Sequence, residues 1–473
     1  MQPMNRISQP CKLCFALISF ALILTVSAAC EQDADDVAAI PAPKITDSVE
    51  PNEALAAVEE NTVPENSRSS AAKELEDVFD VDRPQRWNPY EDDQQEAAVV
   101  VSLTELPEAL LHASGGETIR VKSGRYVDVQ IELKYNGHGT VAVRAEQPGS
   151  VTITGESMIT IQDSEHLILS GFMFDEIKSE NTIVLSGSRD IHITDNYFYR
   201  NGIRPAGKII AIRNGSAYNH IHHNTFDDNK GQGVAIYNGH TPEDIHNKYN
   251  EIYNNYFYLV RPVSEVYEGS SNGLESVQIG QGKYVFNKFF TKVYENLFER
   301  NTGDRAEIIS VKSSNNEVYR NTFLNNDSGL TIRLGDSNKI YSNYFKNTMK
   351  GLRTYGFDQL IYGNYFEGGI TGLQLPAADT TTKAETDNPA PYYQTDRIKV
   401  MNNVFVNPGT QAFLFGNSFN RSRMYVLLPK DSLYQGNEIY ISTKIRPHSH
   451  TFILWKAFVR TLLISPQITI RAI

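Results

Sequence analysis

Cysteine is almost missing from this chain of 473 residues. All three cysteines, Cys11, Cys14 and Cys30, lie within the first 30 residues. The rest of the chain can therefore form no disulfide and no cysteine metal site. We expect packing alone to stabilise it.

Long apolar runs are also scarce. The one conspicuous run, residues 15–26, is too short to span a bilayer. Two basic residues precede it and small residues follow it, which is typical of an export signal. Cys30 after two alanines resembles the lipobox of bacterial lipoproteins, although Ser27 stands where a larger aliphatic residue is usual. We expect residues 1–30 to be a signal peptide that directs the protein to the periplasm, or to the outer membrane of a Gram-negative bacterium through a lipidated Cys30.

Large apolar residues are few in residues 31–96, where 19 acidic residues face five basic ones. Such a segment buries too little surface to offset the entropy lost on ordering, so we expect a flexible acidic tether. The tether accounts for the formal net charge of −12, because residues 97–473 are close to neutral. The acidic balance is therefore no argument against a polyanionic partner.

Sustained helical periodicity is absent too, which argues against an α/β fold. Short strands bounded by Gly and Asp recur instead. An Asn-x-Phe unit closes successive repeats at spacings of 22 and 21 residues, as in Asn321-Thr-Phe323, Asn343-Tyr-Phe345 and Asn364-Tyr-Phe366. Asn suits a turn and Phe suits an inward aromatic stack, and only a stack of such coils has a core.

This repeat predicts an all-β, single-stranded parallel β-helix, a solenoid, over residues 97–420. A short helix within residues 104–111 would cap its first coil. The sequence leaves the structure of residues 421–473 open.

Two basic residues stand out because they are 21 positions apart, on neighbouring coils. Strands of neighbouring coils lie about 4.8 Å apart, so we predict Lys312 and Arg333 one above the other. Glu307 has the opposite strand parity to Lys312, and both would face one groove only if a bend intervened. Arg353 and Tyr355 follow one coil later and would extend a cleft, or else belong to an exposed turn.

Cleavage of a uronic-acid polysaccharide by β-elimination needs a base for the C5 proton, an acid for the departing O4 and a cation that neutralises the carboxylate. A lysine beside arginines suits the base, since neighbouring positive charge favours its neutral form. We therefore interpret Lys312 as the base and Arg333 as the donor to the bridging oxygen. The candidates for carboxylate clamps or metal ligands are Arg305, Glu307 and the segment 272–280, with Asn272, Glu275 and Gln278.

Several ordered motifs resemble polysaccharide lyase family 6, which comprises alginate lyases and chondroitinase B. They include Ala306-Glu-Ile-Ile-Ser-Val-Lys-Ser-Ser314 and Leu330-Thr-Ile-Arg333, and the likeness covers roughly residues 97–416. The resemblance implies a right-handed parallel β-helix. It implies that Lys312 is the catalytic base and Arg333 the catalytic acid. It also implies that Glu307 is one carboxylate of a calcium site, with Asn272 or Glu275 near another ligand.

This sequence departs from the family pattern at three positions. Arg305 replaces a frequent second calcium-binding Glu, Leu334 replaces a frequent His, and Gln278 replaces a common Arg. Calcium takes six to eight oxygen ligands, and a guanidinium removes one and repels the ion. Calcium is therefore one alternative, but our hypothesis is that Arg305 itself neutralises the substrate carboxylate and that the enzyme is calcium-independent.

Taken together, the sequence predicts an exported lyase that cleaves alginate by β-elimination, with an anionic polysaccharide and no nucleic acid as its partner. Three alternatives stay open: a chondroitinase B-like dermatan sulfate lyase, a mannuronan C5-epimerase, and a non-catalytic β-helix that binds polysaccharide. His220, His222 and His223 are interpreted as ladder or groove residues, with a metal cluster as the minor alternative.

Overall fold

The structure is a computed structural model that describes residues 99–238, 247–381, 391–422, 425–442, 463–464 and 468–472. The expected export signal, residues 1–30, and the expected tether, residues 31–96, lie outside these ranges. Within the described ranges, no helix is long and apolar enough to cross a membrane.

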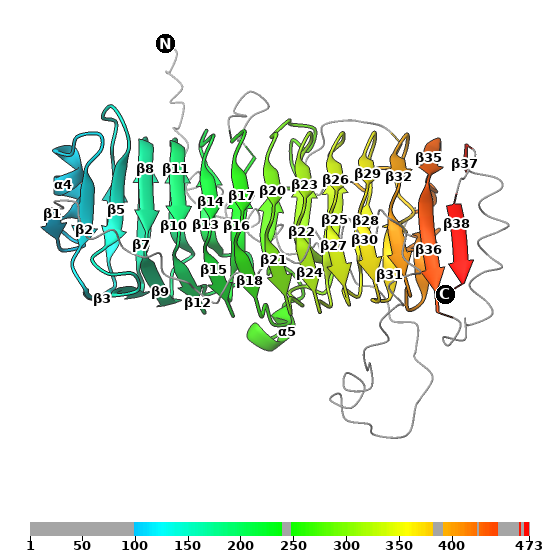
Figure 1. The fold of residues 1–473 in the computed structure, drawn as a ribbon, viewed down its shortest axis with the longest axis horizontal. Coiled ribbons are helices and arrows are strands. Elements are labelled where there is room, and N and C mark those ends of the chain that lie inside the picture. The colour runs from blue at the N-terminus through cyan, green and yellow to red at the C-terminus, as the bar shows by residue number, and fades with distance from the viewer. Residues whose placement is uncertain are drawn as a thin grey trace, which may run out of the picture. The chain divides into compact units, whose positions relative to one another are not determined.

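The described residues wind into successive coils whose strands form three parallel sheets. Figure 1 shows these coils side by side in a row. Each coil adds one strand to sheet A, one to sheet B and one to sheet C. Sheet A contains β1 (Val99–Val101), β2 (Thr118–Val121), β5 (Val141–Ala145), β8 (Glu165–Ser170), β11 (Arg189–Thr194), β14 (His220–His222), β17 (Glu251–Tyr253), β20 (Lys292–Tyr294), β23 (Glu317–Tyr319), β26 (Lys339–Tyr341), β29 (Leu360–Tyr362), β32 (Lys399–Met401), β35 (Ser432–Gln435) and β37 (Leu463–Ile464).

Sheet B contains β3 (Gly124–Val127), β6 (Val151–Gly155), β9 (Phe172–Ile177), β12 (Tyr197–Tyr199), β15 (Thr225–Asp227), β18 (Tyr256–Tyr258), β21 (Leu297–Glu299), β24 (Thr322–Leu324), β27 (Tyr344–Lys346), β30 (Tyr365–Glu367), β33 (Val404–Val406), β36 (Asn437–Ile441) and β38 (Ile468–Ala472). Sheet C contains β4 (Gln130–Leu133), β7 (Met158–Gln162), β10 (Asn181–Ser186), β13 (Lys208–Arg213), β16 (Gln232–Ile236), β19 (Val277–Ile279), β22 (Glu307–Lys312), β25 (Gly329–Leu334), β28 (Leu352–Thr354), β31 (Thr371–Leu375) and β34 (Gln411–Phe415).

Strands of one coil pair in parallel with those of the next, as β5 does with β8, β6 with β9 and β7 with β10. The architecture is the right-handed parallel β-helix that was predicted. Helix α4 (Leu106–Leu111) buries Leu106 and Leu110 at the first coils, where it contacts β2 and β4. It therefore covers the otherwise open end of the core.

The Asn residues of the Asn-x-Phe units form a buried ladder at the turn between sheets A and B. The side-chain amide of Asn321 donates to the side-chain oxygen of Asn343, and Asn343 repeats the bond to Asn364, both at 3.0 Å. The backbone N–H of each Asn donates to the same acceptor. The left-handed backbone conformation belongs to the residue before the Asn, for example Arg320 with φ 52°. These asparagines thus support the turn through side-chain hydrogen bonds and do not adopt the left-handed conformation themselves.

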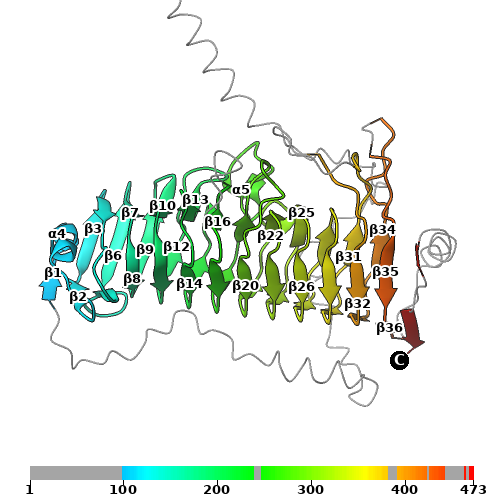
Figure 2. The same cartoon turned by 90° about the horizontal axis from the view of Figure 1, so that it is seen from above.

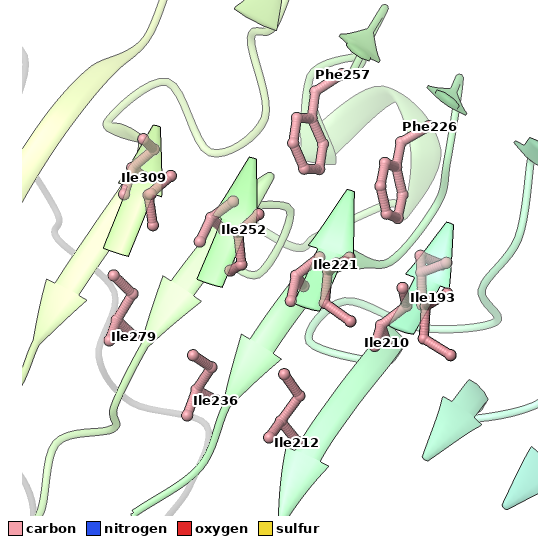
Figure 3. Packing of buried hydrophobic residues seen from close by; sticks show 14 of the residues in the cluster. Ile193, Ile210, Ile212, Ile221, Phe226, Ile236, Ile252, Phe257, Ile279 and Ile309 are labelled. Carbon is pink, nitrogen blue, oxygen red and sulfur yellow. The ribbon is translucent and has the colours of Figure 1, made fainter. Parts of the chain in front are cut away.

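The Phe residues of the same units form a second ladder inside the coil. Phe226 stacks on Phe257 with ring centroids 4.5 Å apart, and Phe257 stacks on Phe298 at 4.9 Å. Figure 3 shows Phe226 and Phe257 above rows of isoleucines from sheets A and C, with Ile221 and Ile252 among them. Aliphatic rows and the aromatic ladder together make one continuous core, as the repeat predicted.

Two insertions interrupt the regular spacing. One follows β18 and contains α5 (Val263–Val266), and the other joins β31 to β32. In Figure 2, α5 and the orange loop that follows β34 project from the same side of the stack. The coils continue beyond residue 420, because β35 pairs with β32 and β36 pairs with β33.

Candidate active site

The chemically distinctive side chains lie on the outer face of sheet C. One row across β19, β22, β25 and β28 contains Gln278, Ser310, Thr331 and Arg353. Towards the N-terminal coils the same row continues as Ala235 and Ala211. Small residues therefore form much of the floor, with longer polar side chains on either side.

Two register shifts between β22 and β25 orient the central residues. Glu307 pairs with Gly329 but Ile309 pairs with Leu330, so Ile308 is an additional residue in β22. Ile308 and Ile309 are both buried in the core. This bulge reverses the strand parity, and it supplies the bend that Glu307 and Lys312 need to face the same groove.

The second register shift corrects the predicted stacking of the two basic residues. Lys312 pairs with Leu334, and Arg333 is the additional residue in β25. Lys312 and Arg333 thus lie on neighbouring strands, as predicted, but the prediction that they sit one above the other is wrong by one residue. A 21-residue spacing does not reveal a bulge, because it predicts that two residues lie on neighbouring coils but not which residues of the two strands pair.

Glu307 is the point on which the positive charges converge. Arg353 donates to its carboxylate at 2.8 Å, and the two side chains are 19% and 7% exposed. Burial alone would raise the pKa of Glu307, but the charges of Lys312, Arg353 and Arg333 outweigh burial and lower it. Among the described residues, the Lys312 amine has no ion-pair partner within 4 Å, so it remains available to a substrate.

A third carboxylate, which the sequence analysis missed, lies beside Glu275 and Glu307. Asp304 accepts hydrogen bonds from the backbone N–H groups of Ala306 and Glu307 at 2.7 and 2.8 Å. Burial, together with the negative charges of Glu275 and Glu307, raises the pKa of Asp304 to about 8. To predict that these three acids lie together, one must know how β22 pairs with the preceding coil. The sequence does not show that pairing.

Lys208 and Gln232 extend the site on the N-terminal side and were also missed. Gln232 donates to the carboxylate of Glu275 at 2.5 Å and to the side-chain oxygen of Gln278 at 2.7 Å. Lys208 pairs with Gln232 across β13 and β16. Burial lowers the pKa of Lys208 to about 8. The sequence signal was a basic residue at the start of a strand whose next four residues are apolar.

Arg333 is covered by the insertion that follows β31. Its guanidinium carbon lies 3.8 Å from the centre of the Tyr392 ring, a cation–π contact. Tyr392 packs on Tyr355, which is 4% exposed and therefore offers little surface to a ligand. Leu334, beside Arg333, packs in a separate apolar cluster with Phe357.

Two predicted residues lie at the margin of this arrangement. Arg305 and Asn272 are both exposed, in the loops that precede β22 and β19. Arg305 has a positive φ of 63°, and its carbonyl accepts a hydrogen bond from Lys350. The carboxylates of Glu275, Asp304 and Glu307 form a cluster.

The carboxylate cluster fits a hard divalent cation by its donor chemistry. Glu275, Asp304 and Glu307 offer oxygen atoms within 4.8 Å of one another. Burial, followed by the negative charges of Glu275 and Glu307, raises the pKa of Asp304, and a bound cation would offset those negative charges. Asp304 thus supplies a carboxylate next to position 305, where Arg305 replaces the frequent glutamate of the family pattern. Arg353 and Gln232 already donate to two of these groups.

Comparison with known proteins decides the family. A family model described as chondroitinase B matches residues 100–443, which is more than half of the chain. The chain belongs to the chondroitinase B family. No curated protein matches the chain in sequence.

Solved structures similar to this chondroitinase B family member share its fold. The PL6 family alginate lyase AlyGC is 24% identical, with a TM-score of 0.62, over 75% of this chain and 52% of that one. A PL6 family polysaccharide lyase from Pseudopedobacter saltans is 22% identical, with a TM-score of 0.62, over 79% and 92%. A mannuronic acid specific family 6 lyase from human gut microbiota is 21% identical, with a TM-score of 0.59, over 79% and 83%. The chain spans about half the length of AlyGC.

Proposed function

We propose that this protein is a lyase that cleaves a uronic-acid polysaccharide of the alginate class by β-elimination. The observation that supports it best is the convergence of Lys312, Arg333 and Arg353 on one buried carboxylate, Glu307, beside a row of small residues on sheet C. A negatively charged sugar placed there would meet a cationic groove with a free amine in it.

In the proposed reaction, the Lys312 amine takes the C5 proton. The electron pair of that bond forms the C4–C5 double bond as the C4–O4 bond breaks. Arg333 donates a hydrogen bond to the bridging oxygen and stabilises its developing charge, and the oxygen leaves as a hydroxyl after taking a proton from solvent water. One Arg333 nitrogen, Nη1, has no hydrogen-bond partner among the described residues.

The substrate carboxylate needs a positive charge beside it, because otherwise the C5 proton is too weakly acidic. Calcium held by Glu275, Asp304 and Glu307 would supply that charge when bound. The sequence-based hypothesis assigns the task to Arg305 and predicts calcium independence. These two proposals give opposite results in a chelator.

Alginate is proposed as the substrate because similar solved structures are described as alginate lyases. Dermatan sulfate is the second candidate, because the matching family model is described as chondroitinase B. Export and lipidation at Cys30 are separate proposals. Replacing Cys30 with Ser should release the protein from the membrane fraction if that cysteine carries a lipid.

The test is to incubate the purified protein with alginate, with polymannuronate and polyguluronate blocks, and with dermatan sulfate, each with and without chelator. Ultraviolet absorbance from the new conjugated double bond reports lyase activity. Lys312→Ala and Arg333→Ala should remove that signal, while Lys339→Ala, a control on sheet A, should keep it.

The same experiment separates the competing functions. A C5-epimerase would change the mannuronate content without new absorbance, and a binding protein would retain alginate without shortening it. Either result would refute the lyase proposal.

A further inference from the structure

A cluster of histidines lies on sheet A, on a different sheet from the proposed active site. His192 in β11 pairs with His220 in β14, and Thr194 pairs with His222. Asp190 lies two residues before His192 in the same strand, and His166 lies on β8 in the preceding coil. The proposed lyase chemistry uses none of these side chains.

Three of these residues bring ligand atoms together. Asp190, His192 and His220 each offer one ligand atom within 4.8 Å of the other two, and all three side chains are partly exposed. The closest pair, His192 Nε2 and an oxygen of Asp190, is 3.5 Å apart. In a tetrahedral zinc site with bonds of about 2.1 Å, neighbouring ligand atoms are separated by roughly 3.4 Å. This pair is therefore already at the required separation.

The second oxygen of the Asp190 carboxylate is held from the preceding coil. His166 Nδ1 lies 2.5 Å from it, and His166 Nε2 lies 3.8 Å from Glu165. Hydrogen bonds of this kind fix the orientation of metal-ligating carboxylates and imidazoles. The Asp190 oxygen that faces His192 is thereby left for another partner.

The same row of sheet A looks different beyond the histidines. It continues as Glu251, Lys292, Glu317 and Lys339, in which acid and base alternate and pair at 2.8 and 2.9 Å. His192 and His220 instead stack two like rings with centroids 4.5 Å apart. Nδ1 of His220 is buried and has no hydrogen-bond partner among the described residues.

We propose that Asp190, His192 and His220 bind a divalent transition metal of the zinc class, with His166 as a positioning residue. Two imidazoles and one carboxylate select zinc, cobalt, nickel or copper over calcium and magnesium, which prefer oxygen ligands. A small rotation of the two stacked rings brings their nitrogens towards one ion, and the solvent-facing side leaves a fourth position for water. The metal would tie two coils together on sheet A.

The experiment is a titration of the purified chain with zinc chloride alone, followed by isothermal calorimetry, in a buffer that contains excess calcium to occupy oxygen-rich sites. The expected result is one saturable equivalent of zinc. Cobalt chloride should give the visible absorption of a tetrahedral complex with nitrogen and oxygen ligands. His192→Gln and His220→Gln should each abolish that equivalent, and His166→Ala should weaken it about 10- to 100-fold.

His138→Ala is the matched control, because His138 is exposed in a turn near the first coils and should leave zinc binding unchanged. Circular dichroism of the glutamine variants checks that they fold. Lyase activity should be the same in all of them, so failure of the metal proposal is distinguishable from failure of the proposed function. The proposal is overturned if folded wild type binds no zinc equivalent, or if the equivalent survives in both glutamine variants.

Discussion

Replacing Arg353 with Met should destabilise the protein far more than breaking an exposed ion pair does. Arg353 and Glu307 are 2.8 Å apart and mostly buried, and Glu307 lies beside two further carboxylates. The methionine keeps most of the side-chain stem but leaves Glu307 as a buried charge without its closest partner. Removal of one member of a buried pair costs about 3–5 kcal/mol.

The matched control is Arg320→Met. Arg320 and Glu295 are 3.3 Å apart, but their side chains are 55% and 37% exposed, and such pairs contribute about 0–1 kcal/mol. The free energy of unfolding is measured by urea denaturation in chelator, so that no bound cation compensates for the lost guanidinium. Adding Glu307→Gln to Arg353→Met should restore part of the loss. If Arg353→Met costs no more than Arg320→Met, the described charge balance at Glu307 is wrong.

Three further predictions follow from the ladder, from Lys208 and from the carboxylate cluster. Asn321→Ala should lower the free energy of unfolding by at least about 1–3 kcal/mol, because it leaves the buried N–H groups of Asn296 without their acceptor. Urea denaturation measures this loss. An unchanged midpoint would contradict the proposed contribution of the Asn ladder to stability. Burial lowers the pKa of Lys208 from 10.5 to about 8, so the folded protein favours the neutral amine. The stability that this neutral amine contributes is fully present above pH 10.5 and is lost as the pH falls through 8. The wild type should therefore gain stability between pH 8 and pH 10 relative to Lys208→Met, and equal pH profiles would contradict this. If the carboxylate cluster holds calcium, chelator should abolish the activity of the wild type. If Arg305 neutralises the substrate carboxylate instead, the wild type should keep full activity in chelator and Arg305→Ala should lose it.

The repeat was visible in the sequence because each coil carries its own copy of the same structural unit. The spacing of Asn321 and Asn343 predicted the coil length, and the Phe residues predicted the inward ladder. Both are buried and stack on their counterparts in the neighbouring coils. A local pattern that repeats at a fixed interval can be recognised without knowing how strands pair.

The site was less predictable because it depends on register. The additional residues Ile308 and Arg333 shift the pairing of β22 and β25, and no spacing in the sequence reveals them. Lys208 and Gln232 are separated in sequence from the residues they meet on sheet C, and Asp304 is separated in sequence from Glu275. Their contribution became apparent only once the strands were aligned.

The rate at which Lys312→Ala produces unsaturated ends from alginate is the most direct test of the account. Loss of a general base costs roughly 10²- to 10⁴-fold in rate. We expect a loss of that size in Lys312→Ala, with alginate still retained by the variant and with Lys339→Ala as active as the wild type. Wild-type rates of absorbance increase in folded Lys312→Ala would contradict the proposal that this amine removes the C5 proton.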